Sequence, residues 1–233
     1  VHLPASLDRD LELPGEVSAP ALHLATALRS FRAELLSDFV GEVIDGNVAA
    51  AQRLSTQLQD FPLLVTRDIE AARAWLRSRI RGSERAGLLA SSNAARLKPH
   101  GIFTKAKIEP AKWFLAPPRD VRSSNALEDA ATEFDVQGLE LDWTCVCWDA
   151  NFRWADGAWR TLQFRGSQWQ AVNDTARQAY IANSYRVLLT RARQGMVVFV
   201  PSGSPVDSTR TSAFYDPTYD ILQRAGLETL LSQ

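Results

Sequence analysis

Short apolar runs alternate with segments of helical periodicity through most of this 233-residue chain. The runs have the length of strands, and their flanking Gly, Pro, Asp and Ser residues are typical of strand ends. Strands that alternate with helices form a mostly parallel sheet with helices packed on both faces. The sequence therefore predicts a three-layer α/β fold. The expected strands are residues 63–66, 87–90, 112–116, 143–148 and 196–200.

The helical segments are bounded by capping residues, glycine or proline. Apolar residues recur at helical spacing over residues 21–58, and the pattern breaks at Asp45-Gly46-Asn47. Asp68 and Asp174 are expected to cap the helices that follow them, because an Asp side chain accepts hydrogen bonds from the first-turn N–H groups. The other expected helices are residues 68–80, a short one from 91–93 to about 99, one turn over 125–131, 174–193 and 217–225.

Composition shifts suggest the domain boundaries. Three prolines interrupt residues 1–20, which are expected to be a linker or the tail of a preceding domain. Residues 21–233 are expected to form one domain. Residues 152–172 are rich in Trp and contain the turn sequence Asp156-Gly157, which predicts an antiparallel excursion. The chain lacks an initiator Met, which indicates a segment excised from a longer protein.

The chain has no sequence feature of a membrane or secreted protein. No apolar run approaches the roughly 20 residues of a membrane span, and residues 1–10 lack the basic flank and apolar core of a signal peptide. Cys145 and Cys147 lie two apart in a predicted strand, so they share a face and are expected to stay buried and reduced. Without neighbouring His residues they are too few for a zinc site. We expect a cytoplasmic protein with no membrane partner and no metal ligands.

The basic residues are strongly biased toward arginine. The chain has 22 Arg and four Lys, with a formal net charge of −1. Arginine suits two-pronged contacts with phosphate and stacking on bases, but a GC-rich genome produces the same bias. The net charge gives no global basic field that would attract nucleic acid. The arginine excess leaves both explanations open.

Three turns are candidate ligand sites, at residues 66–68, 91–93 and 132–138. In open parallel sheets, ligands bind beyond the carboxyl ends of the strands. Free N–H groups at the start of a following helix can there bind phosphate. Ser91 and Ser92 are therefore candidate contacts for nucleic acid. The Ser, Asn and Asp residues of these turns are also explained simply as helix caps.

The third of these turns has a specific spacing, with Thr132 six residues before a Gly-Leu-Glu triplet that begins at Gly138. This spacing resembles motif V of superfamily-one DNA/RNA helicases. The resemblance implies that Thr132 contacts single-stranded nucleic acid and that Gln137, Gly138 and Glu140 lie beside the nucleotide. A glycine turn between a helix and a strand is the structural alternative. The family often has His or a small polar residue where this chain has Phe134-Asp135, which puts nucleic-acid contacts there in doubt.

Residues 190–193, Thr-Arg-Ala-Arg, resemble motif VI of the same helicases. The Thr-Arg-Ala core of that motif carries an arginine finger, so the resemblance implies that Arg191 stabilises charge on a transferring γ-phosphoryl group. On a continuous helix Arg186 and Arg193 share a face while Arg191 points elsewhere. Arg186 or Arg193 is therefore expected to pair with carboxylates.

Residues 28–33 resemble the aromatic–Arg motif that opens the second motor domain of these helicases. The resemblance implies that Arg32 also reaches the γ-phosphate, with Arg29 as the second candidate. The three motifs occur along the chain in the same order as in the family.

Several further segments of the sequence are similar to the carboxyl-terminal half of the Schlafen-group DNA/RNA helicase-like domain, a bacterial family. This resemblance implies a RecA-like domain of the P-loop NTPase type. The half that bears the Walker A loop is expected to be absent, because no G-x-x-x-x-G-K-[ST] sequence occurs in the chain. The matching segments are residues 85–92, 112–115, 120–124, 133–143, 185–195 and 214–216.

The expected function is that of the second motor domain of an ATP-dependent DNA/RNA helicase or translocase. Its partners would be single-stranded DNA or RNA and a missing amino-terminal RecA-like domain, which would hold most of the ATP and its Mg²⁺. One alternative is a metal-dependent nuclease, because paired carboxylates can hold Mg²⁺ ions. The other is a non-catalytic nucleic-acid-binding adaptor. The candidate carboxylates of the nuclease are Glu128, Asp129, Glu133, Asp135, Glu140 and Asp142.

Overall fold

A computed structural model of the protein describes residues 28–231. Six strands form a sheet in which every neighbouring pair is parallel, in the order β3-β2-β4-β8-β1-β9. The predicted α/β architecture with a mostly parallel sheet is confirmed. The linker predicted for residues 1–20 lies outside the described residues. The strands are β1 (Leu63–Thr66), β2 (Ala86–Ala90), β3 (Ala130–Ala131), β4 (Leu141–Cys147), β8 (Ala192–Phe199) and β9 (Glu228–Thr229).

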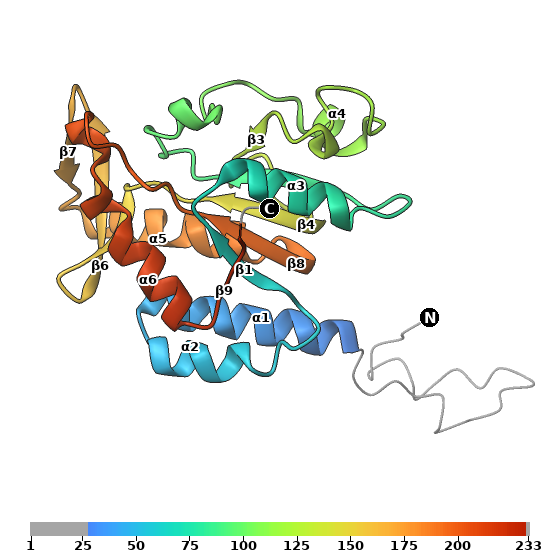
Figure 1. Ribbon diagram of the computed structural model, residues 1–233, viewed down its shortest axis with the longest axis horizontal. Helices are drawn as coiled ribbons and strands as arrows, with labels where there is room; N and C mark the ends of the chain where they lie inside the picture. Colours follow the sequence, from blue (N-terminus) through green and yellow to red (C-terminus); the bar gives the residue numbers. More distant parts are fainter. Residues whose placement is uncertain (1–27, 232–233) are drawn as a thin grey trace, which may run out of the picture.

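Helices cover both faces of this sheet, as Figure 1 shows. Successive strand residues point to opposite faces, so Val65 and Val198 belong to one buried core whereas Cys147 and Phe199 belong to the other. The first core contains residues of five helices, and the second contains residues of α3 (Ile69–Arg79). The five helices are α1 (Leu28–Asp45), α2 (Val48–Ser55), α4 (Pro110–Leu115), α5 (Thr175–Leu189) and α6 (Asp216–Arg224).

Several local predictions are confirmed by the backbone. Helices α1 and α2 are separated at Gly46, which has a left-handed φ of 80°. The Asp68 side chain accepts a hydrogen bond from Glu70 N, and the Asp174 side chain accepts one from Arg177 N. These are the expected N-caps. The two cysteines are buried and free, as predicted.

The predicted antiparallel excursion is present as a separate three-stranded sheet in the order β5-β6-β7. A turn at Asp156 and Gly157, both with positive φ, joins the first two strands. Positive φ at both central residues is the conformation of a tight hairpin turn. The strands are β5 (Phe152–Ala155), β6 (Ala158–Arg165) and β7 (Gln168–Ala171).

Three predictions for the segment between β2 and β4 are wrong. Residues 112–116 are not a strand, because α4 (Pro110–Leu115) begins with Pro at a first-turn position and buries Trp113. No α-helix starts at residues 91–93, where the chain forms a turn, and a short 3₁₀ helix follows at Lys98–His100. The helical turn predicted for 125–131 is a 3₁₀ helix over Ser124–Ala126, which ends at Leu127 in a left-handed conformation.

The helix predicted for residues 174–193 ends earlier, at Leu189. The Thr190 hydroxyl donates to the carbonyl oxygens of Arg186 and Val187 and so satisfies acceptors that the helix end leaves free. Strand β8 begins at Ala192, which is paired with Leu141 of β4. Arg191 therefore lies in a turn and Arg193 in a strand, so the helical face predicted for Arg186 and Arg193 does not exist.

Candidate functional site

The residues predicted to form the site divide between the two edges of the parallel sheet. In such a sheet all strands begin at one edge and end at the other, here called the amino edge and the carboxyl edge. Ser91, Ser92 and Thr132 directly follow β2 and β3, and so lie at the carboxyl edge. The other group precedes β4 and β8 and lies at the amino edge. Its members are Gln137, Gly138, Glu140 and Arg191.

Pairing of β4 with β8 brings Arg191 against the turn of residues 137–140 at the amino edge. The Arg191 Nη1 atom donates to Leu139 O over 3.3 Å, and its Nε atom donates to Val187 O over 3.1 Å. The guanidinium group is therefore fixed between the end of α5 and the turn. The residue is only partly buried, and no described residue bonds its Nη2 atom. That atom can donate to a ligand.

Arg193 of the motif and Arg186, which precedes the motif in α5, pair with carboxylates, as predicted. The Arg193 Nε atom lies 3.7 Å from Glu140 Oε2, and both side chains are largely exposed. The Arg186 Nη2 atom lies 3.1 Å from Asp45 Oδ1, at the end of α1. Glu140 is thus held at the amino edge by Arg193, within reach of the same surface as Arg191.

Gly138 allows the turn at the amino edge to form. Its φ of +77° is one that residues with a side chain rarely adopt. A Cβ atom added there would meet no atom within 4 Å, so the space beside this backbone is open. Gln137 is also exposed. The turn therefore presents an accessible backbone and an unburied amide next to Arg191.

Arg32 lies in the first part of α1 and is exposed. Its guanidinium makes no hydrogen bond or ion pair with any residue from 28 to 231. In Figure 1 the first turns of α1 lie at the same end of the molecule as the start of β1, which is the amino edge. Arg32 is therefore a free cation on the side of the sheet that carries Arg191.

The amino edge carries groups of the kinds that bind phosphate and ribose. Guanidinium groups bind phosphate oxygens, and an amide and a carboxylate can bind ribose hydroxyl groups. Arg191 and Arg32 supply the first kind of group, and Gln137 and Glu140 supply the second. The chain has no G-x-x-x-x-G-K-[ST] loop.

At the carboxyl edge, Glu133 organises the turn that follows β3. It is 8% exposed. Its carboxylate accepts hydrogen bonds from Ser92 N at 2.8 Å, from Ser92 Oγ at 2.7 Å and from Tyr180 OH at 2.9 Å. Burial, followed by this bond to Glu133, raises the pKa of Tyr180 to about 12. The Tyr180 hydroxyl therefore stays protonated and continues to donate to Glu133 at physiological pH.

The three residues predicted to contact nucleic acid differ in accessibility. The Thr132 side chain is buried and donates to Asp135 Oδ2 over 2.6 Å. Ser91 is fully buried and shares a hydrogen bond with Ser184, so it ties the turn after β2 to α5. Ser92 is partly exposed. Of the three, Ser92 alone presents part of its surface to solvent without any rearrangement.

Sequence reasoning missed the most connected polar residue at the carboxyl edge, which is Asp149. This fully buried residue follows β4, and its carboxylate accepts hydrogen bonds from Arg96 N, Ala150 N and Tyr215 OH. Burial raises its pKa, although the hydrogen bonds from Arg96 and Ala150 act in the opposite direction. Its position just beyond a predicted central strand was a usable signal. Asp149 joins three separate segments of the chain.

The six carboxylates of the nuclease hypothesis do not form one cluster. Glu133 lies at the carboxyl edge, whereas Asp142 lies near the start of β4 and accepts hydrogen bonds from Arg85 N and Gln194 Nε2. Among residues 28–231, no group of three or more His, Cys, Asp or Glu side chains is arranged to hold a metal ion. The carboxylate arrangement therefore gives no support to a two-metal nuclease site.

No helix within the described part of the chain has both the length and the hydrophobicity needed to cross a bilayer.

Comparison with known proteins finds a family for this chain. The model of the family described as Schlafen group 3, DNA/RNA helicase domain matches residues 6–202. This span includes every site residue predicted from the sequence, from Arg32 to Arg191. No curated protein and no solved structure shows significant similarity to the chain.

Proposed function

The chain belongs to the Schlafen group 3 DNA/RNA helicase domain family, and on this premise we propose that it is the second RecA-like domain of an ATP-dependent DNA or RNA helicase or translocase. A first RecA-like domain of the same protein would hold most of the ATP and its Mg²⁺. Single-stranded DNA or RNA would be the other partner. The protein that carries both domains is called the parent protein below.

The observation that carries this proposal is the division of the motif residues between the two edges of one sheet. The β4–β8 pairing joins Arg191 to the 137–140 turn at the amino edge. Thr132 and Ser92 lie at the carboxyl edge. A nucleic-acid motor needs one surface for ATP and another for the nucleic-acid strand. The placement of these residues at opposite edges of the sheet supports such a separation.

The residues at the amino edge would act on a nucleotide held mainly by the first domain. Arg191 and Arg32 would donate hydrogen bonds to the phosphate oxygens and neutralise their charge, and Gln137 and Glu140 would bind on the ribose side. When bound, ATP with Mg²⁺ supplies the phosphoryl group whose transfer drives movement. Because these side chains reach the nucleotide only when the two domains close, hydrolysis would be coupled to domain motion.

An assay of ATP binding and hydrolysis by the 233-residue chain tests whether the chain needs the first domain for turnover. We expect weak ATP binding, measured by calorimetry, and no phosphate release, because the chain has no G-x-x-x-x-G-K-[ST] loop. Sustained ATP hydrolysis by the chain alone would contradict the proposal. Mg²⁺-dependent cleavage of a supercoiled plasmid in the same preparation would instead indicate a nuclease.

A further inference from the structure

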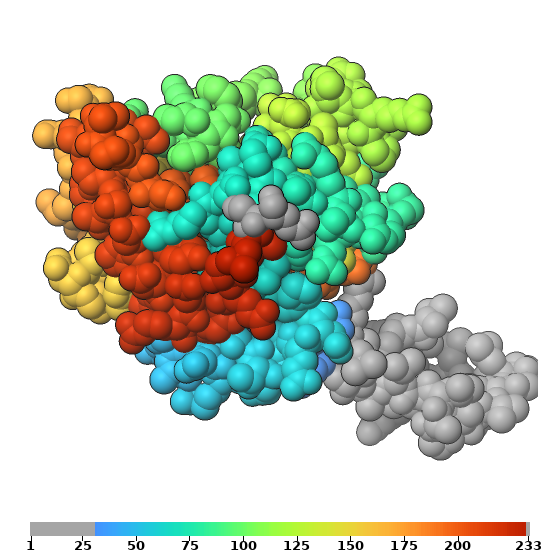
Figure 2. All heavy atoms as spheres, viewed as in Figure 1, coloured from blue at the N-terminus to red at the C-terminus, as the bar shows by residue number. Residues whose placement is uncertain are grey.

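Lysine is concentrated in one short segment of the chain. All four lysines lie between residues 98 and 112, a segment with a single carboxylate, that of Glu109. In Figure 1 this green segment runs above the β3 side of the sheet, from the carboxyl edge toward α4. Figure 2 shows the same segment forming the upper surface of the molecule. A chain with a net charge of −1 thus carries a local strip of positive charge.

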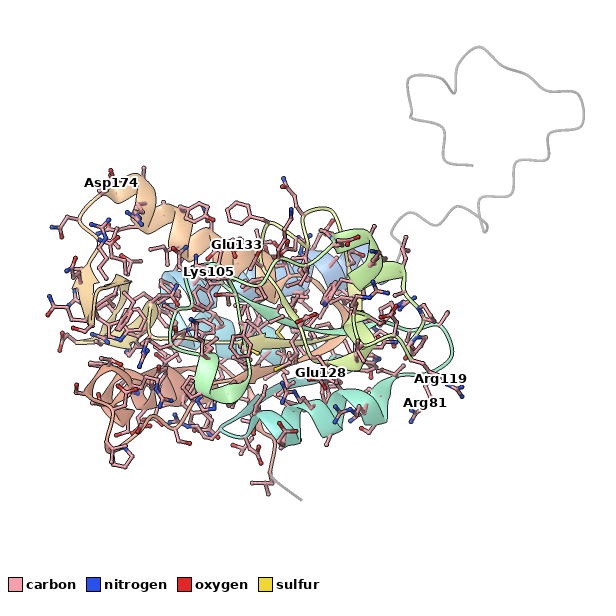
Figure 3. The ribbon with its side chains drawn as sticks, turned by 90° about the horizontal axis from the view of Figure 1, so that it is seen from above. Arg81, Lys105, Arg119, Glu128, Glu133 and Asp174 are labelled. Atoms are coloured by element: carbon pink, nitrogen blue, oxygen red, sulfur yellow. The ribbon has the colours of Figure 1, made fainter. Side chains whose placement is uncertain are left out.

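The lysines of this strip remain largely available for a ligand. Lys98 and Lys107 make no ion pair or side-chain hydrogen bond with any residue that the structure describes. The Lys105 Nζ atom donates to Ser92 O over 3.0 Å, and Lys112 forms an exposed ion pair with Glu109. Seen from above, Lys105 and Glu133 lie close together in Figure 3, which agrees with their shared contacts to Ser92.

Beside the strip, an aromatic pair is exposed to solvent. Phe134 is 62% exposed, and its ring stacks on Tyr180 with the centroids 6.2 Å apart and the planes 27° apart. The Tyr180 hydroxyl is bonded to Glu133, which in turn accepts two hydrogen bonds from Ser92. These hydrogen bonds hold the Tyr180 ring in place, so the ring on which Phe134 stacks is fixed.

Phe134 also forms one wall of a cleft between α4 and the turn that precedes β4. The cleft has a volume of about 670 Å³, which is within the range of small-ligand sites. Its walls are mainly apolar, and Asp135 and Gln137 supply its polar groups. Leu115, on the α4 side, is 69% exposed. The remaining lining residues are Pro110, Ala111, Phe114 and Leu139.

We propose that this strip and cleft form the single-strand binding track of the domain, with one base stacked on Phe134 inside the cleft and the flanking phosphates bound by Lys98, Lys105 and Lys107. The inference rests on the proposed function and adds to it the residues that hold the strand. Aromatic faces beside a positively charged groove are the features that bind single strands with little sequence preference. The Asp135 carboxylate would bond the edge of the stacked base.

A nucleic-acid strand explains the combination of features better than a protein partner. A purely apolar cleft would suit a hydrophobic segment, but this one ends at Phe134, whose stacking partner Tyr180 is linked through Glu133 and Ser92 to Lys105. A strand uses both, since its phosphates need cations and its bases have faces that stack. Bases of any kind can stack, so we expect binding of both DNA and RNA.

Fluorescence anisotropy with the 233-residue chain and labelled 20-nucleotide oligo(dT) and oligo(U) tests the track. Phe134→Ala should weaken binding roughly 5- to 100-fold, the range expected for loss of one base–aromatic stack. Phe134→Trp should retain binding. A 2-aminopurine base within the oligonucleotide should be quenched by the wild-type chain and much less by Phe134→Ala. Val121→Ala, which alters another exposed apolar side chain, should leave the affinity unchanged.

The charge contribution is separated from stacking by the salt dependence of binding. Lys107→Ala should lower the slope of log K against log salt by about 0.7, the value for one phosphate contact on a single strand. Arg53→Ala, which removes an exposed cation of α2, should leave the slope unchanged. Thermal unfolding should show that all five variants remain folded.

Two outcomes would overturn the inference, and each is distinct from failure of the proposed function. If the wild-type chain binds but Phe134→Ala binds equally well with unchanged quenching, the track lies elsewhere. If the wild-type chain binds neither oligonucleotide, the track does not exist in this domain. Whether the parent protein hydrolyses ATP is measured separately, and that result decides the motor assignment in either case.

Discussion

Replacing Arg191 by Ala in the parent protein is expected to lower kcat for ATP hydrolysis by roughly 10³-fold or more, the scale found for arginine fingers. The guanidinium is held at the amino edge by bonds to Val187 O and Leu139 O, and its Nη2 atom has no partner among the described residues. A group fixed in this way would stabilise charge on a transferring phosphoryl group without first having to be ordered. Because the effect is on the transition state, KM should change far less than kcat.

Two further variants make this result specific to Arg191. Arg191→Lys keeps the charge but loses the planar two-pronged geometry, so it should recover only part of the rate. Arg186→Ala removes an arginine of the preceding helix α5, one that is paired with Asp45, and it should retain most of the activity. Full turnover by Arg191→Ala would show that this residue is not the finger. A large drop in the melting temperature would instead assign its role to folding.

Replacing Asp149 by Ala is expected to lower the free energy of unfolding of the chain by about 3–5 kcal/mol. The substitution leaves the part-buried Arg96 N and the buried Ala150 N and Tyr215 OH groups without their acceptor. Each unsatisfied buried donor costs about 1–3 kcal/mol. Urea denaturation of both proteins under the same conditions measures the difference.

A graded series tests whether the hydrogen bonds cause this loss. Asp149→Asn keeps one acceptor oxygen and should therefore lose less stability than Asp149→Ala. Tyr215→Phe removes a single donor from the carboxylate and should cost about 1–2 kcal/mol. If Asp149→Ala lowers the free energy of unfolding by less than 1 kcal/mol, the network does not hold these segments together.

The parts of the fold that the sequence predicted are those determined by local pattern. The strands around Val65, Cys145 and Val198 are short apolar runs bounded by turn residues, and the structure places them in one parallel sheet. The N-caps at Asp68 and Asp174 also depend on neighbouring residues alone. Local pattern was sufficient because the side chains and the fold favour the same conformation at these positions.

The wrong predictions occur where longer-range packing decides the conformation. The apolar residues 112–116 are compatible with a strand, but Trp113 turns into the core and its indole N–H donates to Asp129 O. The end of α5 at Leu189 depends on pairing between Ala192 and Leu141, which are 51 positions apart in the chain. Such contacts are not visible in the local sequence.

The candidate site also combines features that the local sequence predicts with features that depend on longer-range packing. Motif spacing placed Gln137, Gly138 and Glu140 in one turn, and β4–β8 pairing brings Arg191 to that turn. Motif spacing could not reveal that Ser91 is fully buried. The roles of the individual residues in binding ATP and nucleic acid remain predictions.

ATP turnover by the parent protein, measured with and without single-stranded DNA or RNA, tests the central claim most directly. If the chain is the second domain of a nucleic-acid motor, steady-state hydrolysis should depend on Mg²⁺ and rise severalfold or more when oligo(dT) or oligo(U) is added. Stimulation should saturate with oligonucleotide concentration. Absence of ATP hydrolysis under all of these conditions, in a folded parent protein that still binds the oligonucleotide, would contradict the account and indicate a non-catalytic nucleic-acid-binding adaptor.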